Sequence, residues 1–258
     1  MNVVTHNREA WDLQVEKGNP WTIPVSADAI SRARAGDWQI ILTPNIPVPR
    51  SWYPPIVGCR TLCLASGGGQ QGPILAAAGA VVTVFDNSPA QLERDRQLSD
   101  QHHLGITAVQ GDMADLGAFA DASFDLIVHP VSNVFAQDIR PVWRGAARVL
   151  RQGGVLMAGF NNPVLYLFDT AAAERGELIV CHKLPYSDLH SLPPEKRDDL
   201  ISRKVPLEFS HTLEDQIGGQ CDAGLAITAM FEDHDSPGSP NALDRYMPLY
   251  IATRAVKL

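Results

Sequence analysis

A short apolar run that ends in glycines constrains the fold of this chain more than any other feature. Residues 61–65 are apolar and lead into a serine and three glycines at 66–69, and an Ala-rich run follows at 72–79 with Pro73 in its first turn. An apolar run of this length that stops at glycine is typical of a buried strand, and proline is tolerated in the first turn of a helix. The glycines permit tight turns and close approach of a ligand, while the helix offers free N–H groups. The stretch therefore predicts a strand, glycine turn and helix that bind a nucleotide.

Two patterns bear on which nucleotide such a turn binds. Gly67, Gly69 and Gly72 satisfy the G-x-G-x-x-G pattern of dinucleotide sites, which is weak evidence alone. A β-branched strand at 81–85 ends in Asp86, about 20 residues beyond the glycines, where a carboxylate suits ribose hydroxyls. The alternative is that Asp86 only caps the turn that follows it. Ribose binding is favoured because strand, spacing and residue type agree.

The alternation of strands and helices predicts the fold class. Strand-like runs stand at 60–65, 81–85, 106–110, 124–128 and 154–160. Helix-like runs stand between them at 72–79, 89–101 and 139–151. This order is typical of an α/β protein with a doubly wound, mostly parallel sheet, whose ligand lies beyond the carboxyl ends of the strands. Those ends carry Ser66, Asp86, Asp112 and His129.

These ordered pieces resemble the class I S-adenosylmethionine-dependent methyltransferases, in the broad group that includes the ubiquinone-biosynthesis type. That family has a strand into a glycine-rich loop, an acidic residue after the second strand and a Gly-Asp step after the third. The matching pieces lie at 64–69, 85–86, 111–113, 124–128 and 148–156. One departure is Cys63, which stands where the family often has an acidic residue. Contact with the methionine amino group then falls to backbone carbonyls near Ala65 and Ser66.

The resemblance implies a fold, a reaction and a set of residues. It implies a Rossmann-like sheet of seven strands, with a strand at 225–231 and an antiparallel last strand at 246–254. It implies an enzyme that transfers a methyl group in line from S-adenosylmethionine to a small-molecule acceptor and leaves S-adenosylhomocysteine. Asp86 would hold the ribose, Asp112 the adenine amino group, and Met113 would pack on the ring. The implied cofactor residues are Ala65, Ser66, Gly67, Gly68, Gly69, Asp86, Asn87, Gly111, Asp112, Met113 and Pro130.

Residues for catalysis and acceptor binding are predicted from position alone. His129 ends the fourth strand, beside the family's methyl-transfer site, where it could act as a general base or could be a structural histidine. Aligning an activated donor can contribute about 7–11 kcal/mol, so methyl transfer does not require an obvious catalytic dyad. The tryptophans could equally be anchors to the core. The predicted acceptor-side residues are Trp21, Trp52, Asn133, Tyr166, Phe168, Tyr186 and His190.

The chain outside this core predicts two coverings of the site. Residues 1–57, with a proline-rich connector after their helices, are expected to lie over the active site as an N-terminal segment. The methyltransferase domain is expected to span 58–258, and its residues 161–210 to form an inserted cap that sets acceptor specificity, or else a surface excursion. Further helices are expected at 7–13, at 26–34, and from Thr212 to an end at Gly218-Gly219.

Composition narrows the class of partner. A net charge of −8 without a Lys/Arg cluster argues against nucleic acid, and no apolar run reaches the roughly 20 residues of a membrane span. The four cysteines form no C-x-x-C pair or zinc ligand set, so we expect no metal and a reduced, cytoplasmic setting. The sequence does not indicate an oligomeric state.

Two other functions fit the glycine turn. One is an NAD(P)-dependent Rossmann oxidoreductase, against which stand the Gly111-Asp112 step and the missing Tyr/Lys dyad. The other is a protein that binds S-adenosylmethionine without catalysis. The choice of cofactor tests the first alternative, and transfer of a labelled methyl group tests the second.

Overall fold

The computed structural model describes all 258 residues and contains one seven-stranded sheet. Its strands are β1 (Arg60–Leu64), β2 (Val81–Asp86), β3 (Thr107–Gln110), β4 (Phe124–His129), β5 (Leu150–Asn161), β6 (Leu225–Asp233) and β7 (Tyr250–Lys257). They lie in the order β3-β2-β1-β4-β5-β7-β6. The first five pair in parallel, and β7 is antiparallel to both β5 and β6. The predicted α/β class, the seven strands and the reversed last strand are therefore confirmed.

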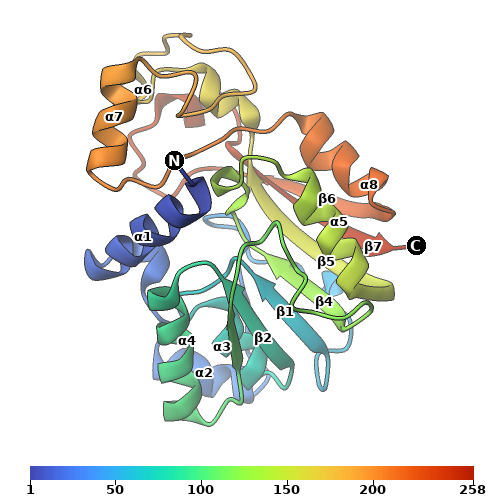
Figure 1. The fold of residues 1–258 in the computed structure, drawn as a ribbon. Helices are drawn as coiled ribbons and strands as arrows, with labels where there is room; N and C mark the ends of the chain where they lie inside the picture. The colour runs from blue at the N-terminus through green and yellow to red at the C-terminus, as the bar shows by residue number, and fades with distance from the viewer.

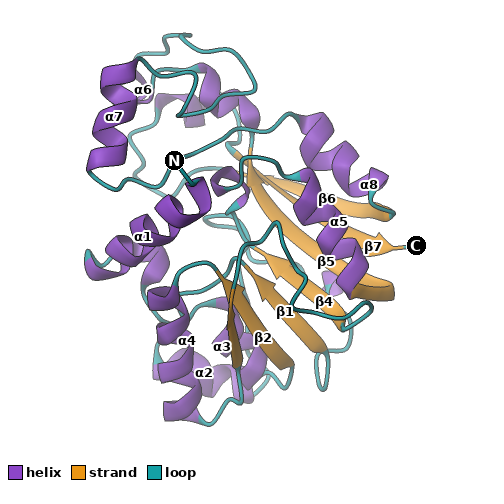
Figure 2. Ribbon diagram, in the orientation of Figure 1, coloured by secondary structure: helices purple, strands orange, loops and turns teal.

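Helices cover both faces of the sheet, as Figure 2 shows. On one face lie α2 (Ala27–Arg34), α3 (Gln71–Ala77) and α4 (Pro89–His102), and on the other α5 (Arg140–Val149) and α8 (Gly219–Asp222). The remaining helices are α1 (Val3–Glu16), α6 (Thr170–Glu174) and α7 (Pro194–Ser202). Alternate residues of β1 serve the two cores, because successive side chains of a strand point to opposite faces. Cys63 packs with α2, α3 and α4, whereas Leu62 and Leu64 pack with α5 around Trp143.

The turn after β1 forms because the sequence supplies a helix start directly beyond it. Pro73 stands early in α3, and a Cβ at Gly72 would lie 2.8 Å from Val84 Cγ2 in β2. Only glycine lets α3 approach the sheet this closely. In α4 the N-cap is Ser88, whose hydroxyl accepts a hydrogen bond from the Gln91 N–H at 3.1 Å. These two helix starts bring the ends of β1 and β2 together.

Helix α1 and the segment around α6 and α7 form a layer beyond the carboxyl ends of the strands (Figure 1). Val3 of α1 is buried with Leu207 and Phe209. Asn7, also in α1, donates to the carbonyls of Leu207 (3.0 Å) and Phe135 (3.2 Å) and accepts from the Leu207 N–H (2.8 Å). One buried side chain thus joins the N-terminal helix to two distant segments.

The helix expected to end at Gly218-Gly219 does not end there. A π-helical turn at Glu214–Gly218 continues into α8, and the φ angles of Gly218 and Gly219 are both −59°, which is helical. A Cβ at Gly219 would lie 2.8 Å from Trp143 Cδ1 in α5. The prediction was wrong because this glycine serves close helix packing rather than a left-handed helix end.

Candidate functional site

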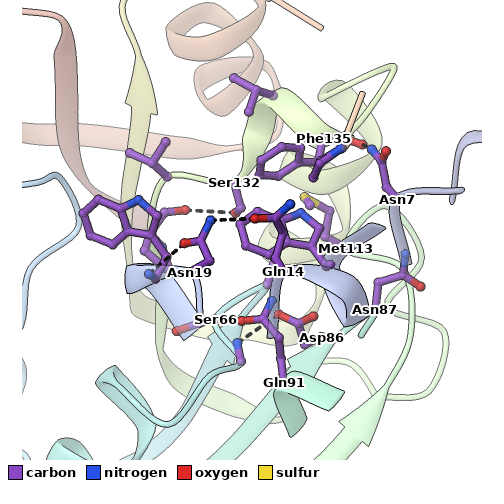
Figure 3. Close-up of a pocket in the computed structure, with 18 of the residues that line it drawn as sticks. Asn7, Gln14, Asn19, Ser66, Asp86, Asn87, Gln91, Met113, Ser132 and Phe135 are labelled. Atoms are coloured by element: carbon purple, nitrogen blue, oxygen red, sulfur yellow. Dashed lines mark hydrogen bonds between the residues drawn. The ribbon is translucent and has the colours of Figure 1, made fainter. Parts of the chain in front are cut away.

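A cavity of about 460 Å³ lies at the carboxyl ends of the parallel strands. This volume falls within the range of roughly 300–1,000 Å³ that is usual for small-molecule sites. Its floor comes from the loops after β1, β3 and β4 and from the end of β2, and its roof from α1, residues 19–21 and residues 205–208. Figure 3 shows side chains of the floor, such as Asp86 and Ser66, and of the roof, such as Gln14, around one space.

Asp86 joins the end of β2 to the glycine turn. Its Oδ2 accepts from the Gly67 N–H at 2.9 Å, and its Oδ1 accepts from the Ser88 N–H at 2.9 Å. Burial raises the pKa of Asp86, and the backbone hydrogen bonds oppose that shift. Each carboxylate oxygen can accept a second hydrogen bond, so Asp86 can hold a pair of ribose hydroxyls from within the cavity wall.

Asp95 of α4 is a second carboxylate at this turn, and the sequence analysis missed it. Its Oδ2 accepts from the N–H groups of Gly68 (3.0 Å) and Gly69 (3.2 Å), while its Oδ1 is buried without a partner. Burial raises the pKa of Asp95 to about 7. Its position inside a polar helical stretch gives no sequence signal, because the contact exists only once α4 packs beneath the turn.

Eight of the eleven predicted cofactor residues line the cavity. They are Ala65, Ser66, Gly67, Asp86, Asn87, Asp112, Met113 and Pro130. Gly68, Gly69 and Gly111 are not among the lining residues. A Cβ at Gly68 would lie 3.0 Å from the Trp21 carbonyl oxygen and one at Gly69 3.1 Å from Pro24, so both face the N-terminal segment. A Cβ at Gly111 would overlap the Phe85 ring.

His129 does not line the cavity, although the neighbouring Pro130 and Ser132 do. It is completely buried, with Nδ1 2.8 Å from the Leu64 carbonyl oxygen and Nε2 in hydrogen-bond contact with Asn133 Oδ1. Asn133 is equally buried and donates to Gln216 Oε1 at 2.8 Å. Burial lowers the pKa of His129. The chain of contacts His129–Asn133–Gln216 is therefore structural, and neither predicted role, general base or acceptor contact, fits this placement.

The predicted aromatic residues divide between cavity and core. Trp21 lines the cavity and is 47% exposed. Trp52 does not: it is buried against Phe231, with ring centroids 5.3 Å apart, as expected of an anchor. Phe168 forms an isolated bridge with Val180 in the segment after β5 and also lies outside the cavity lining.

Tyr166 and Tyr186 stand one layer behind the cavity wall. Their rings stack with centroids 5.4 Å apart, and neither they nor His190 belong to the lining. The Tyr166 hydroxyl donates to Glu208 Oε2 at 2.7 Å, and Glu208 does line the cavity. Within the segment 161–210, the lining residues are Asn161, Val205, Pro206 and Glu208 rather than the predicted aromatic side chains.

Comparison with known proteins places this geometry in a family. The model of the methyltransferase-domain family matches residues 62–158. An uncharacterized methyltransferase of Bacillus subtilis, YbaJ, is 51% identical over 256 residues, which cover 99% of each chain. The chain belongs to the class I S-adenosylmethionine-dependent methyltransferases. It is therefore an enzyme whose methyl donor is S-adenosylmethionine, which decides against the oxidoreductase and the non-catalytic alternatives.

Solved structures agree on the fold. An S-adenosylmethionine-dependent methyltransferase from Mesorhizobium loti superposes with a TM-score of 0.61 at 19% identity, over 81% of this chain and 95% of that one. A geranyl diphosphate methyltransferase, solved with S-adenosylmethionine, superposes with a TM-score of 0.52 at 15% identity, over 79% and 80% of the two chains. None of the helices has the length and apolar character needed to cross a membrane.

Proposed function

We propose that the enzyme methylates a small molecule, and that the eight lining residues named above hold the methyl donor. The observation that supports this proposal most directly is that a single cavity extends from Asp86, at the end of β2, to Asn161, at the end of β5. In the order β2-β1-β4-β5, these strands are three spacings apart, or roughly 14 Å. A donor over β1–β3 and an acceptor over β4 and β5 would then meet in a single space.

The roles of the donor-side residues follow from their positions. Asp86 holds the ribose, Asp112 lies beyond β3 for the adenine amino group, and Met113 offers an apolar face for the ring. The bound cofactor supplies an activated methyl group on a sulfonium. The protein aligns the two reactants and excludes water, and alignment of this kind can contribute about 7–11 kcal/mol.

The roof of the cavity supports the proposal that the acceptor is a small molecule. Trp11 and Gln14 of α1 and Pro206 of the insertion line the cavity opposite its floor, so the space lies beneath chain rather than on an open face. We infer that residues 1–57 and 161–210 act as the N-terminal cover and the cap of a domain that begins near residue 58. An acceptor must fit under both.

Titration with S-adenosylhomocysteine tests the donor half. Asp86→Asn is expected to weaken the affinity at least tenfold, because hydrogen bonds to a charged group contribute about 1.5–3 kcal/mol and 1.4 kcal/mol is a factor of ten. Asp100→Asn, an exposed change at the end of α4, is the matched control and should leave the affinity unchanged. Equal binding by both variants, with equal melting temperatures, would contradict the assignment of Asp86.

A further inference from the structure

A cluster of polar side chains forms the cavity wall on the side away from Asp86. Asn161 ends β5, Tyr250 begins β7, and Glu208 lies in the insertion, and all three line the cavity. Tyr166 stands behind them, where its hydroxyl donates to Glu208 Oε2 at 2.7 Å and accepts from Asn161 Nδ2 at 3.1 Å. The cluster joins the insertion to the end of the sheet.

Two acceptor oxygens of this cluster have no donor. Glu208 is half-buried, and its Oε1 takes part in no hydrogen bond within the protein, whereas Oε2 of the same carboxylate is paired with Tyr166. Asn161 Oδ1 is buried without a partner. Burial raises the pKa of Glu208, and the neighbouring Asp188 acts in the same direction. The unpaired, buried Asn161 Oδ1 is costly as it stands, and the accessible Glu208 Oε1 is free to accept a hydrogen bond from a ligand that brings donor groups.

The charges of the cavity restrict what such a ligand can be. Asp86, Asp112 and Glu208 are its charged residues, and no lysine, arginine or histidine is among the thirty that line it. An anionic acceptor, such as a carboxylate or phosphate, would meet like charge on the protein and no cationic side chain, so only the sulfonium of the donor could attract it. A neutral hydroxyl or an amine would meet free acceptor oxygens.

We propose, building on the function proposed above, that Glu208 and Asn161 form the acceptor subsite and that it selects an alcohol, a phenol or an amine over an anion. Glu208 Oε1 takes the hydrogen bond from the O–H or N–H of the acceptor. Tyr166 is a positioning residue, since it holds Oε2 and so points Oε1 into the cavity. The aromatic walls of Trp11 and Phe135 suit an acceptor with an apolar body.

Three probes of one shape test the subsite: benzyl alcohol, benzylamine and benzoate, each titrated into the enzyme saturated with S-adenosylhomocysteine and followed by protein NMR. The wild type should bind benzyl alcohol and benzylamine at least tenfold more tightly than benzoate. Glu208→Gln should weaken benzylamine at least tenfold and strengthen benzoate. The matched control Glu195→Gln, an exposed change in α7 of the same insertion, should preserve the wild-type order.

The outcomes separate this inference from the function on which it rests. If S-adenosylhomocysteine binds but benzoate binds as well as the other probes, if none of the probes binds, or if Glu208→Gln leaves their order unchanged, the acceptor subsite is wrong and the donor site stands. If S-adenosylhomocysteine itself does not bind, the proposed donor site fails first. Should Glu208→Gln not fold, Glu208→Asp keeps the charge but withdraws it by one methylene. This variant should bind benzyl alcohol and benzylamine severalfold more weakly, and its affinity for benzoate should not increase.

Discussion

The two halves of the cavity hold their carboxylates in different ways. In the donor half, Asp86 and Asp95 accept hydrogen bonds from backbone N–H groups of the glycine turn. In the half that we propose for the acceptor, Glu208 accepts from the Tyr166 hydroxyl, and Asp188 behind it accepts from the Tyr186 hydroxyl and from the Glu208 N–H. A site built on main-chain groups depends on loop geometry, whereas one built on side chains can change by single substitutions. We therefore expect single substitutions to alter the half proposed for the acceptor more easily than the half proposed for the donor.

The largest effect of a substitution at a single pH is expected in β5, which packs against the Leu42 segment of the cavity wall. A Cβ at Gly159 in β5 would overlap the carbonyl group of Leu42, whose oxygen accepts from the Val131 N–H at 3.0 Å. Gly159→Ala must displace backbone, so we expect a loss of about 3 kcal/mol in unfolding free energy. Gly218→Ala, where the nearest atom lies 3.8 Å away in a helix, should instead be neutral or gain up to about 1 kcal/mol. Denaturant titration measures the unfolding free energy of both variants. Equal values for Gly159→Ala and Gly218→Ala would show that the Leu42 segment can move aside at little cost.

The next effect concerns Asn7, which joins α1 of the cavity roof to the segments around Phe135 and Leu207. Asn7→Ala removes three hydrogen bonds and leaves the buried Leu207 N–H and carbonyl unpaired, so we expect a loss of about 2 kcal/mol. Affinity for S-adenosylhomocysteine should also fall severalfold, because α1 lines the cavity. The control Gln97→Ala removes an exposed side chain of α4 and should alter neither quantity. If Asn7→Ala lowers stability but not affinity, the roof serves the acceptor half alone.

Most of the residues that the sequence placed at the strand ends do line the cavity, because the signals that locate strand ends are local. A buried strand, a glycine turn and the residue that ends each strand lie close together along the chain, so Ser66, Asp86 and Asp112 could be placed at one edge of a sheet. The expected positions of β1–β5 agree with the structure to within a few residues, although β5 begins at Leu150 rather than near residue 154.

Of the residues predicted for the acceptor side, only Trp21 lines the cavity, because the contacts that form this wall are distant in sequence. The sequence around Glu208 has no pattern that indicates a cavity-lining residue. Tyr166 was predicted to contact the acceptor, but it lies behind the cavity wall. His129 was placed correctly at the end of β4, but only the packed structure shows that its ring turns into the core toward Asn133. Strand ends can be located by pattern, whereas side-chain direction and burial depend on tertiary packing.

The pH dependence of stability should show an effect that accumulates over several pH units. The pKa of Asp95 is about 7 in the folded protein against an ordinary value of 3.8, so between these pH values the folded state keeps a proton that the unfolded state releases. Stability should therefore fall as pH rises across this window, by at most about 1.4 kcal/mol per pH unit from this group. Asp95→Asn should remove that slope and Asp100→Asn should retain it, as measured by denaturant titration from pH 4 to 7. Parallel curves for wild type and Asp95→Asn would show that Asp95 is ionised throughout.

The smallest effect separates strain from binding in the donor half. Ala65 lines the cavity with a φ of +46°, and Ala122, exposed and far from the cavity lining, has a φ of +54°. A left-handed backbone costs a non-glycine residue about 1–2 kcal/mol, and the added freedom of glycine in the unfolded chain offsets part of that cost. Both Ala65→Gly and Ala122→Gly should therefore gain about 0.5–1 kcal/mol of stability.

Only Ala65→Gly should also alter binding, because it removes a methyl group from the cavity wall. A buried methyl contact contributes about 0.8 kcal/mol, so the affinity for S-adenosylhomocysteine should fall about three- to fourfold, while Ala122→Gly leaves it unchanged. Calorimetric titration resolves a change of this size. A gain in affinity for Ala65→Gly would mean that the left-handed alanine obstructs the donor half, and the backbone of the turn rather than its side chain would then be what recognises the cofactor.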